Sequence, residues 1–154
     1  PRFRALFNTR DRIALISCIT VKNKKFTLCN IHLDARINSK QRIKQLDFAL
    51  KLLKKNYPQN IIIAGDFNTH PFFLAGRIIP FFYQNQFKRL KSYLNKQWFS
   101  CYSPSKIYTM KRGLLKMHLD QIYTNSFPIV NSDVEKDVHA SDHHPVWADI
   151  KFEK

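Results

Sequence analysis

The stretch IIIAGDFN at residues 61–68 places a run of apolar residues directly before a glycine and two polar side chains. The β-branched run predicts a short buried strand over residues 61–64. Because side chains alternate along an extended chain, we expect Asp66 and Asn68 to point the same way across Phe67. Gly65 would let another backbone or a ligand approach closely. A carboxylate and a carboxamide on one side can hold a divalent cation and donate to a phosphate oxygen, or simply complete a local turn.

Two strands and a helix are predicted before this stretch. The strands cover residues 13–21 and 26–33 and form a hairpin that turns at residues 22–25. Both faces of the hairpin are apolar, which predicts that both sides are covered. A helix follows over residues 39–56, with Ser39 as its N-cap.

The segments after residue 70 are less regular. Gly76 and Pro80 interrupt the helical pattern, and residues 84–96 favour a helix. Strands are predicted over residues 116–124 and 145–152. Five aromatic residues gather in the intervening segment, which indicates core or a lipid-contacting patch: Phe72, Phe73, Phe81, Phe82 and Tyr83.

The cysteines exclude a zinc ribbon or a thioredoxin-like motif, because Cys18, Cys29 and Cys101 form no CxxC pair. A turn at residues 22–25 would make Cys18 and Cys29 cross-strand neighbours. They would form a disulfide only in an oxidising compartment, and buried free thiols are otherwise expected.

The charge of the chain is strongly basic: 26 Lys and Arg against 11 Asp and Glu give +15. Such a surface attracts polyanions, nucleic acid and anionic membranes above all, although an AT-rich genome produces the same Lys-rich composition without selection. No apolar stretch approaches the length of a membrane span. The first residues include neither a starting Met nor the apolar core of a signal peptide, so the chain reads as already cut and localisation stays open.

Further polar residues lie where apolar strands end. His32 closes the strand at residues 26–33, and Asp120 lies among apolar neighbours. A buried carboxylate needs a cationic or donor partner, and the nearest chemical candidate is His143. Asp142 and His143 adjoin just before a strand, so Asp142 can ligate a metal while His143 meets a reacting oxygen.

Four motifs occur in order at strand ends: NIHL at residues 30–33, GDFN at 65–68, LDQI at 119–122 and SDHHPV at 141–146. In this combination the chain resembles the C-terminal portion of the endonuclease/exonuclease/phosphatase superfamily, which has the DNase I-like fold. The resemblance implies an α/β fold in which helices flank a two-sheet β-sandwich. It also implies Mg²⁺ as the cofactor, with Mn²⁺ as an alternative.

The resemblance also implies roles for individual residues. His143 would be the general base, or would stabilise the phosphoryl group in flight, oriented by Asp120. Asp142 would ligate the metal, Asp66 and Asn68 would position water and phosphate, with a second cation as an option, and His32 would contact a phosphate oxygen. Attack of water on a phosphodiester of nucleic acid, lipid or a small molecule is the implied reaction.

The sequence departs from the family in one respect, because nothing matches the early strand that carries a metal-ligating Glu. Residues 1–154 are therefore expected to form one partial domain with its N-terminal part missing and one sheet face uncovered, which predicts poor solubility or association. The alternative to an enzyme is a remnant that binds phosphate-bearing ligands without turnover. The loops at residues 70–115, which would set the substrate, carry no readable pattern.

Overall fold

The computed structural model describes residues 12–57, 59–69, 86–101, 108–138 and 140–152. The elements in chain order are β1 (Ala14–Val21), β2 (Lys24–His32), α1 (Ser39–Asn56), β3 (Ile61–Asp66), α3 (Gln86–Lys96), β4 (Met110–Arg112), β5 (Leu115–Met117), β6 (Asp120–Thr124), β7 (Ile129–Val134) and β8 (Val146–Ile150). The aromatic cluster at residues 72–83 lies outside the described residues. None of the helices in the described ranges has the length and apolar character that crossing a membrane requires.

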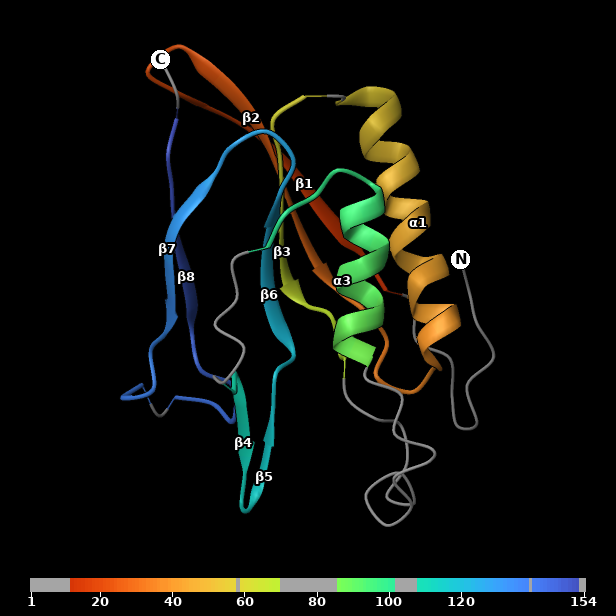
Figure 1. Cartoon of the computed structure of the whole chain (residues 1–154), viewed down its shortest axis with the longest axis vertical. Helices are drawn as coiled ribbons and strands as arrows, with labels where there is room; N and C mark the ends of the chain where they lie inside the picture. The colour runs from red at the N-terminus through yellow and green to blue at the C-terminus, as the bar shows by residue number, and fades with distance from the viewer. Residues whose placement is uncertain (1–11, 58, 70–85, 102–107, 139, 153–154) are drawn as a thin grey trace.

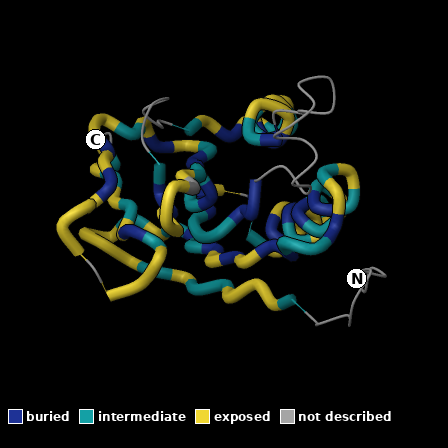
Figure 2. Tube along the Cα trace, turned by 90° about the horizontal axis from the view of Figure 1, so that it is seen from below, coloured by how far each residue is buried: buried dark blue, intermediate teal, exposed yellow. Residues whose placement is uncertain are grey.

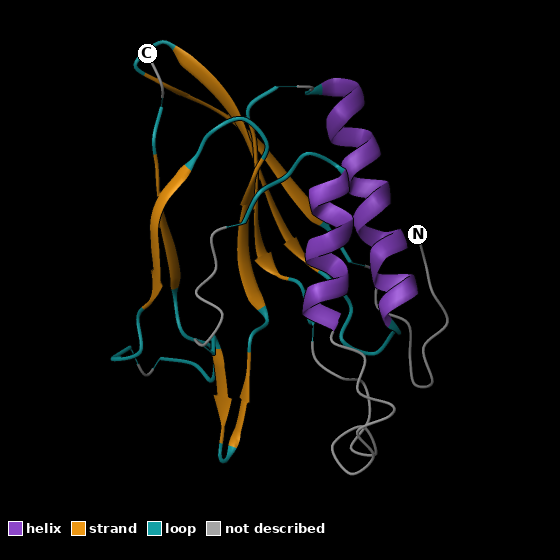
Figure 3. Cartoon of the chain, viewed as in Figure 1, coloured by secondary structure: helices purple, strands orange, loops and turns teal. Residues whose placement is uncertain are grey.

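The largest sheet has the strand order β1-β2-β3-β6. β2 and β3 are parallel, and α1 connects them as a crossover helix, whereas the other two pairings are antiparallel. α1 and α3 lie side by side on one face of this sheet (Figures 1 and 3). The core fills the space between the two helices and the sheet, where buried parts of the chain gather (Figure 2). Its fully buried members include Cys29, Leu46, Ile63, Leu94 and Tyr123.

The hairpin of β7 and β8 forms a second, smaller sheet that contacts β6 through β8. Phe152 joins this layer to the large sheet, because its ring centroid lies 4.6 Å from that of Phe127 and 5.7 Å from that of Phe26. Two sheets with helices on the outer face of one of them agree with the α/β sandwich expected from the sequence. β8 confirms the half-buried strand predicted near the C-terminus, while β7 was not predicted, because Asn131, Ser132 and Asp133 interrupt its apolar pattern.

The register of the first hairpin differs from the prediction. Lys22 and Asn23 both have positive φ, at 47° and 64°, and form a two-residue turn in place of a turn over residues 22–25. Cys18 is therefore opposite Thr27, and Cys29 is opposite Ile16. All three cysteines are free, and only Cys29 is buried, so the expectation of buried thiols is wrong for Cys18, which is exposed.

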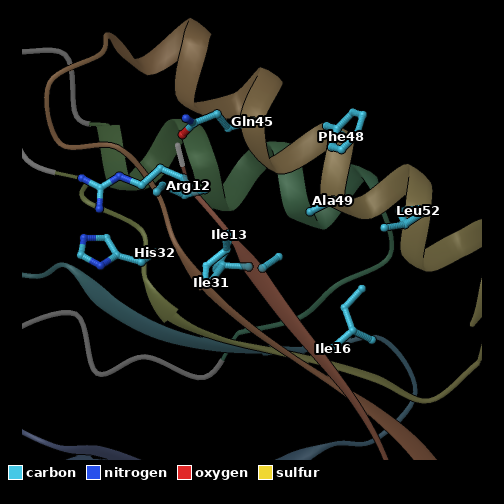
Figure 4. Close-up of a pocket in the computed structure, with 11 residues that line it drawn as sticks. Arg12, Ile13, Ile16, Ile31, His32, Gln45, Phe48, Ala49 and Leu52 are labelled. Atoms are coloured by element: carbon cyan, nitrogen blue, oxygen red, sulfur yellow. The ribbon is translucent and has the colours of Figure 1, made fainter. Parts of the chain in front are cut away.

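The outer face of β1 is open to solvent. Leu15 is 62% exposed, and Ile13, just before β1, is 83% exposed, so the prediction that both faces of the hairpin are covered is wrong here. On the helix side, an apolar groove of about 240 Å³ runs between β1 and α1 and includes Ile16 and Phe48 in its lining. Figure 4 shows the groove, with Arg12 at the end that is nearest to His32.

Helix α1 spans the predicted residues 39–56, but its N-cap is Asn38 and not Ser39. The Asn38 side chain accepts from the Gln41 N–H at 3.0 Å, and the Gln41 side chain accepts from the Asn38 N–H at 3.1 Å, which completes a capping box. The buried stripe of the helix contains Arg42 besides Leu46, Leu50 and Leu53. No apolar periodicity indicated this buried arginine.

The strand predicted over residues 116–124 is two strands. β5 pairs with β4 in a separate hairpin, whereas β6 pairs with β3 in the large sheet, and the chain changes partner at His118 and Leu119. The Thr69 hydroxyl donates to the His118 carbonyl at 2.7 Å, and the Phe67 N–H donates to the Leu119 carbonyl at 2.9 Å, which fixes this break beside the end of β3.

Candidate active site

The polar residues at the ends of β2, β3 and β6 form one row across the sheet. His32 is the register partner of Asp66, and Asp66 is the register partner of Asp120. Register partners on adjacent strands point to the same face, so the three side chains stand next to one another. His32 Nε2 lies 3.6 Å from Asp66 Oδ2, and the row lies on the face opposite the helices.

Gly65 permits the close approach of β2 and β3 beside this row. A Cβ atom at Gly65 would lie 2.0 Å from the Ile31 carbonyl oxygen, and the residue has a φ of +135°. The prediction that Gly65 allows another backbone to approach closely is confirmed, and that backbone is β2.

His143 reaches the row from the segment between β7 and β8. Its Nδ1 atom lies 2.8 Å from Asp120 Oδ2, which gives the half-buried carboxylate the partner predicted for it. The segment is held against β4, because the Lys111 N–H donates to the Asp142 carbonyl at 2.9 Å and the His144 N–H donates to the Thr109 carbonyl at 2.8 Å. Residues from three separate parts of the chain therefore meet at one edge of the sheet.

Burial and the neighbouring hydrogen bonds and charges shift the pKa values of Asp120 and His143 in opposite directions. Burial tends to lower the pKa of His143, but the hydrogen bond to Asp120 and the charges of Asp120, Asp66 and Asp142 outweigh burial and raise it. Burial raises the pKa of Asp120, against the hydrogen bonds from Thr109 and His143. Both hydrogen bonds to Asp120 favour its charged form, and this carboxylate holds the pKa of His143 above its usual range.

Asn68 holds Asp66 in place. The Asn68 N–H donates to Asp66 Oδ1 at 2.8 Å, and its side-chain amide donates to Asp66 Oδ2 at 3.0 Å and to the Leu33 carbonyl at 2.8 Å. Asn68 is buried and has a φ of 48°, a conformation that Asn tolerates better than most residues. Its amide nitrogen is thus committed to protein atoms.

The side chains of Asp66, Asp120 and His143 fit a divalent cation. One ligand atom from each lies within 4.8 Å of the other two. Two carboxylates that face each other across adjacent strands repel, and a bound cation would relieve this repulsion. Asp142, expected as the metal ligand, lies outside this group; it is exposed and its Oδ1 lies 3.4 Å from Ser141 Oγ.

Thr109 is a residue of the site that the sequence reasoning missed. It is fully buried, and its hydroxyl oxygen accepts from the Leu119 N–H at 2.9 Å and from the Asp120 N–H at 3.0 Å. Its backbone pairs with Met117 on one side and with His144 on the other. Thr109 therefore sets the spacing between Asp120 and the segment that carries His143. Only its place just before β4 marks it in the sequence.

A second ion-pair cluster is centred on Asp34, two residues after His32. Arg36 binds both carboxylate oxygens of Asp34, at 3.0 and 2.8 Å, and Arg12 lies 3.7 Å from the same group. The hydrogen bonds from Arg36 lower the pKa of Asp34 to about 2, although burial opposes this. Arg42 packs nearby and donates to the carbonyls of Asp34 and Ile37 and to the Gln86 side chain; burial lowers its pKa to about 10.

A family model described as Endonuclease/Exonuclease/phosphatase family matches residues 5–143. This match covers the four motifs almost completely, and the chain belongs to this family. A search of curated proteins found no match.

Solved structures show the same DNase I-like fold. The endonuclease domain of TRAS1, a telomere-specific non-LTR retrotransposon, is 15% identical with a TM-score of 0.69, and the match covers 92% of this chain and 63% of that one. The human nocturnin catalytic domain with bound sulfate is 19% identical with a TM-score of 0.66, over 97% and 56%. D. rerio TDP2 complexed with a single-strand DNA product is 17% identical with a TM-score of 0.62, over 92% and 62%. The chain thus spans a little over half of each of these structures.

Proposed function

We propose that this chain is a divalent-metal-dependent hydrolase of phosphodiester bonds. The observation that carries the proposal is the His143–Asp120 pair at 2.8 Å, with Asp66 and His32 in the same row. A histidine fixed by a carboxylate and facing further polar groups is the arrangement of general-base catalysis. Membership of a family of phosphoesterases supports the choice of phosphorus as the reacting centre.

In this proposal, Asp120 fixes the ring of His143 through Nδ1, so that Nε2 faces the attacking water. Nε2 takes a proton from the water as its oxygen forms a bond to phosphorus and the bond to the leaving oxygen breaks. Asp120 stabilises the imidazolium that results. His32, which is 58% exposed in its side chain, contacts a non-bridging phosphate oxygen, and Asp66, oriented by Asn68, positions the water.

We propose that Asp66, with Asn68 behind it, and Asp142 hold Mg²⁺, with Mn²⁺ as a substitute. Asp120 and His143 lie close enough to Asp66 to share a cation with it, but in this proposal they serve the proton transfer instead. When bound, the cation would neutralise charge that develops on the phosphate. Asp142 lies next to His143 and has an exposed side chain, so it is accessible to a metal at the same edge.

The substrate class we propose is nucleic acid, with a phospholipid as the alternative. The charge of +15 favours a polyanion, and TDP2 was solved with a single-strand DNA product. The lipid alternative depends on the aromatic residues 72–83, which lie outside the described residues.

The test is hydrolysis of bis(4-nitrophenyl) phosphate and of a labelled DNA in Mg²⁺ and in EDTA, with the variants His143→Ala and Asp142→Asn. We expect His143→Ala to lower kcat by about 10²–10⁴-fold, the range for a general base. Asp142→Asn is expected to weaken the dependence on Mg²⁺. Asp137→Asn is the matched control, because Asp137 is exposed and is not part of the row.

Turnover that survives in EDTA, or that His143→Ala leaves intact, contradicts the proposal. Metal-independent binding of DNA with no turnover in any condition would favour the alternative of a phosphate-binding remnant.

A further inference from the structure

Tyr108 is an aromatic residue beside the site that the proposed chemistry does not use. Its ring contacts side chains from three other parts of the chain. The centroid of the His144 ring lies 5.6 Å from that of Tyr108, with the ring planes at 64°. The ammonium group of Lys116, on β5, lies 4.9 Å from the Tyr108 centroid, and that of Lys136, just after β7, lies 5.5 Å from it. A cation over an aromatic ring is attracted to it, so these contacts hold the Tyr108 ring in place.

The side chain of His144 is held by packing and not by hydrogen bonds. The residue is only 8% exposed, and neither of its ring nitrogens has a hydrogen-bond partner within the described ranges. A buried polar group without a partner gives up its hydrogen bonds to water, so ring contacts have to keep this imidazole inside. Tyr108 provides such a contact, in the edge-to-face arrangement that aromatic pairs favour. Without the Tyr108 ring, His144 would turn towards water.

The direction of His144 decides the direction of His143. The two residues are consecutive in a segment that forms a β-bridge with the start of β4, and the His144 N–H donates to the Thr109 carbonyl at 2.8 Å. Consecutive side chains of an extended segment point to opposite sides. On one side, His144 contacts Tyr108. On the other side, His143 Nδ1 lies 2.8 Å from Asp120 Oδ2. A rotation of the segment that releases His144 would therefore also withdraw His143 from the carboxylate.

Two adjacent residues thus act on the two members of the catalytic pair. The hydroxyl of Thr109 accepts from the Asp120 N–H at 3.0 Å and fixes the strand that carries the carboxylate. The ring of Tyr108 acts on His143 through His144. Both contacts are needed to bring the carboxylate and the imidazole to hydrogen-bond distance, because each fixes only one of them.

We propose that Tyr108 is a positioning residue: its ring holds His144 in place, and this keeps His143 Nδ1 on Asp120 and Nε2 towards the attacking water. The inference rests on the proposed function, since it adds a residue to that same site. It gives Tyr108 no contact with the substrate. It also gives no role to the Tyr108 hydroxyl or to the ring nitrogens of His144, because packing alone carries the effect.

The direct experiment is ¹H–¹⁵N NMR of the histidine rings in ¹⁵N-labelled protein, in EDTA and at alkaline pH, where the rings are neutral. This measurement needs no turnover, and His143→Ala assigns the signals. In the unmodified chain we expect His143 to carry its proton on Nδ1, which donates to Asp120. Tyr108→Leu and His144→Ala are each expected to give the mixture of tautomers that a ring without a partner adopts. Tyr108→Phe keeps the ring and should keep the Nδ1–H form.

The second experiment is kinetic and uses Mg²⁺-dependent hydrolysis of bis(4-nitrophenyl) phosphate. Tyr108→Leu and His144→Ala are each expected to lower kcat about 10–100-fold while KM stays within about twofold, because a misplaced base slows the chemical step and leaves binding intact. Since both act through one contact, the double variant should be no slower than either single variant. His144→Phe keeps a packed ring and should retain kcat within about twofold, as should Tyr108→Phe.

Phe87→Leu is the matched control. Phe87, on α3, also contacts a histidine ring, that of His118 at 4.9 Å, and a lysine, Lys91 at 5.9 Å, and both partners lie outside the segment that carries His143. This variant is expected to leave the His143 tautomer and kcat unchanged.

An unchanged His143 tautomer in both Tyr108→Leu and His144→Ala would overturn the proposal, and so would equal effects of Phe87→Leu. A loss in His144→Phe as large as in His144→Ala would also overturn it, because the ring nitrogens would then act themselves. A His143 tautomer that depends on Tyr108, in a protein without Mg²⁺-dependent hydrolysis, would uphold the positioning while refuting the proposed function.

Discussion

Replacing Gly65 by Ala is expected to be one of the most destabilising single-methyl changes in this chain. The added Cβ would lie 2.0 Å from the Ile31 carbonyl oxygen and 2.9 Å from Asn30 Oδ1, whereas real Cβ contacts essentially never fall under 3.0 Å. β2 and β3 would have to separate by about 1 Å beside the pair His32 and Asp66.

The size of the effect follows from two contributions. A φ of +135° costs an L-residue about 1–3 kcal/mol, and each weakened ladder hydrogen bond costs about 1 kcal/mol. We expect a loss of about 4 kcal/mol in the free energy of unfolding, which corresponds to a decrease in Tm of roughly 10 °C for a chain of this size. Urea and thermal unfolding followed by circular dichroism measure both quantities.

Gly113→Ala is the matched control. Gly113 also has a positive φ, +58°, but a Cβ there would meet nothing within 4 Å. Its replacement is expected to cost only about 1 kcal/mol, so the difference between the variants isolates the collision with β2. Equal losses in the two variants, or a loss below about 1 kcal/mol for Gly65→Ala, would refute the reasoning.

Three further changes test the groups around the site. Thr109→Val removes the acceptor of the Leu119 and Asp120 N–H groups and is expected to cost about 2 kcal/mol in the free energy of unfolding and to lower kcat. Thr109→Ser keeps the hydroxyl and should restore both the stability and kcat. A Thr109→Val variant with unchanged stability and kcat would contradict the positioning role. Asp34→Asn is expected to cost about 2 kcal/mol near neutral pH, because the folded-state pKa of Asp34 is lowered to about 2 from an ordinary 3.8. This stabilisation is present above about pH 4 and is lost as the pH falls towards about 2. Unfolding curves at several pH values should therefore show a weaker acid dependence in the variant, and identical curves would count against this expectation. Arg42→Met leaves the Asp34 and Ile37 carbonyls and the Gln86 side chain without their donor. The variant is expected to lose about 3 kcal/mol in the free energy of unfolding measured with urea. A loss under about 1 kcal/mol would show that the protein does not depend on this buried arginine for stability.

The parts of the fold that could be predicted are those in which local pattern and tertiary demand agree. The apolar run at residues 61–63 is fully or nearly fully buried, and the amphipathic pattern of residues 39–56 forms α1. The need of a buried carboxylate for a partner led from Asp120 to His143, although 23 positions separate them in the chain.

The parts that could not be predicted depend on long-range geometry. The hairpin register is set by positive φ at Lys22 and Asn23, which are not glycines, so the turn gave no strong signal. In the sequence, β5 and β6 have the pattern of one continuous strand. They are separate in the structure because β5 pairs with β4, a partner that the sequence did not reveal. Arg42 and Thr109 are buried polar residues. Arg42 continues the stripe of Leu46, Leu50 and Leu53, but its charge gave no sign of burial, and Thr109 stands in no periodic pattern.

The central claim, that Asp120 and His143 act as one catalytic unit, is tested most directly by a double-mutant cycle on kcat for Mg²⁺-dependent phosphodiester hydrolysis. If Asp120 acts through His143, the double variant Asp120→Asn/His143→Ala should be no slower than His143→Ala alone, within about twofold. Losses that multiply in the double variant would show that the two residues act independently, which would contradict the role assigned to the 2.8 Å contact between them.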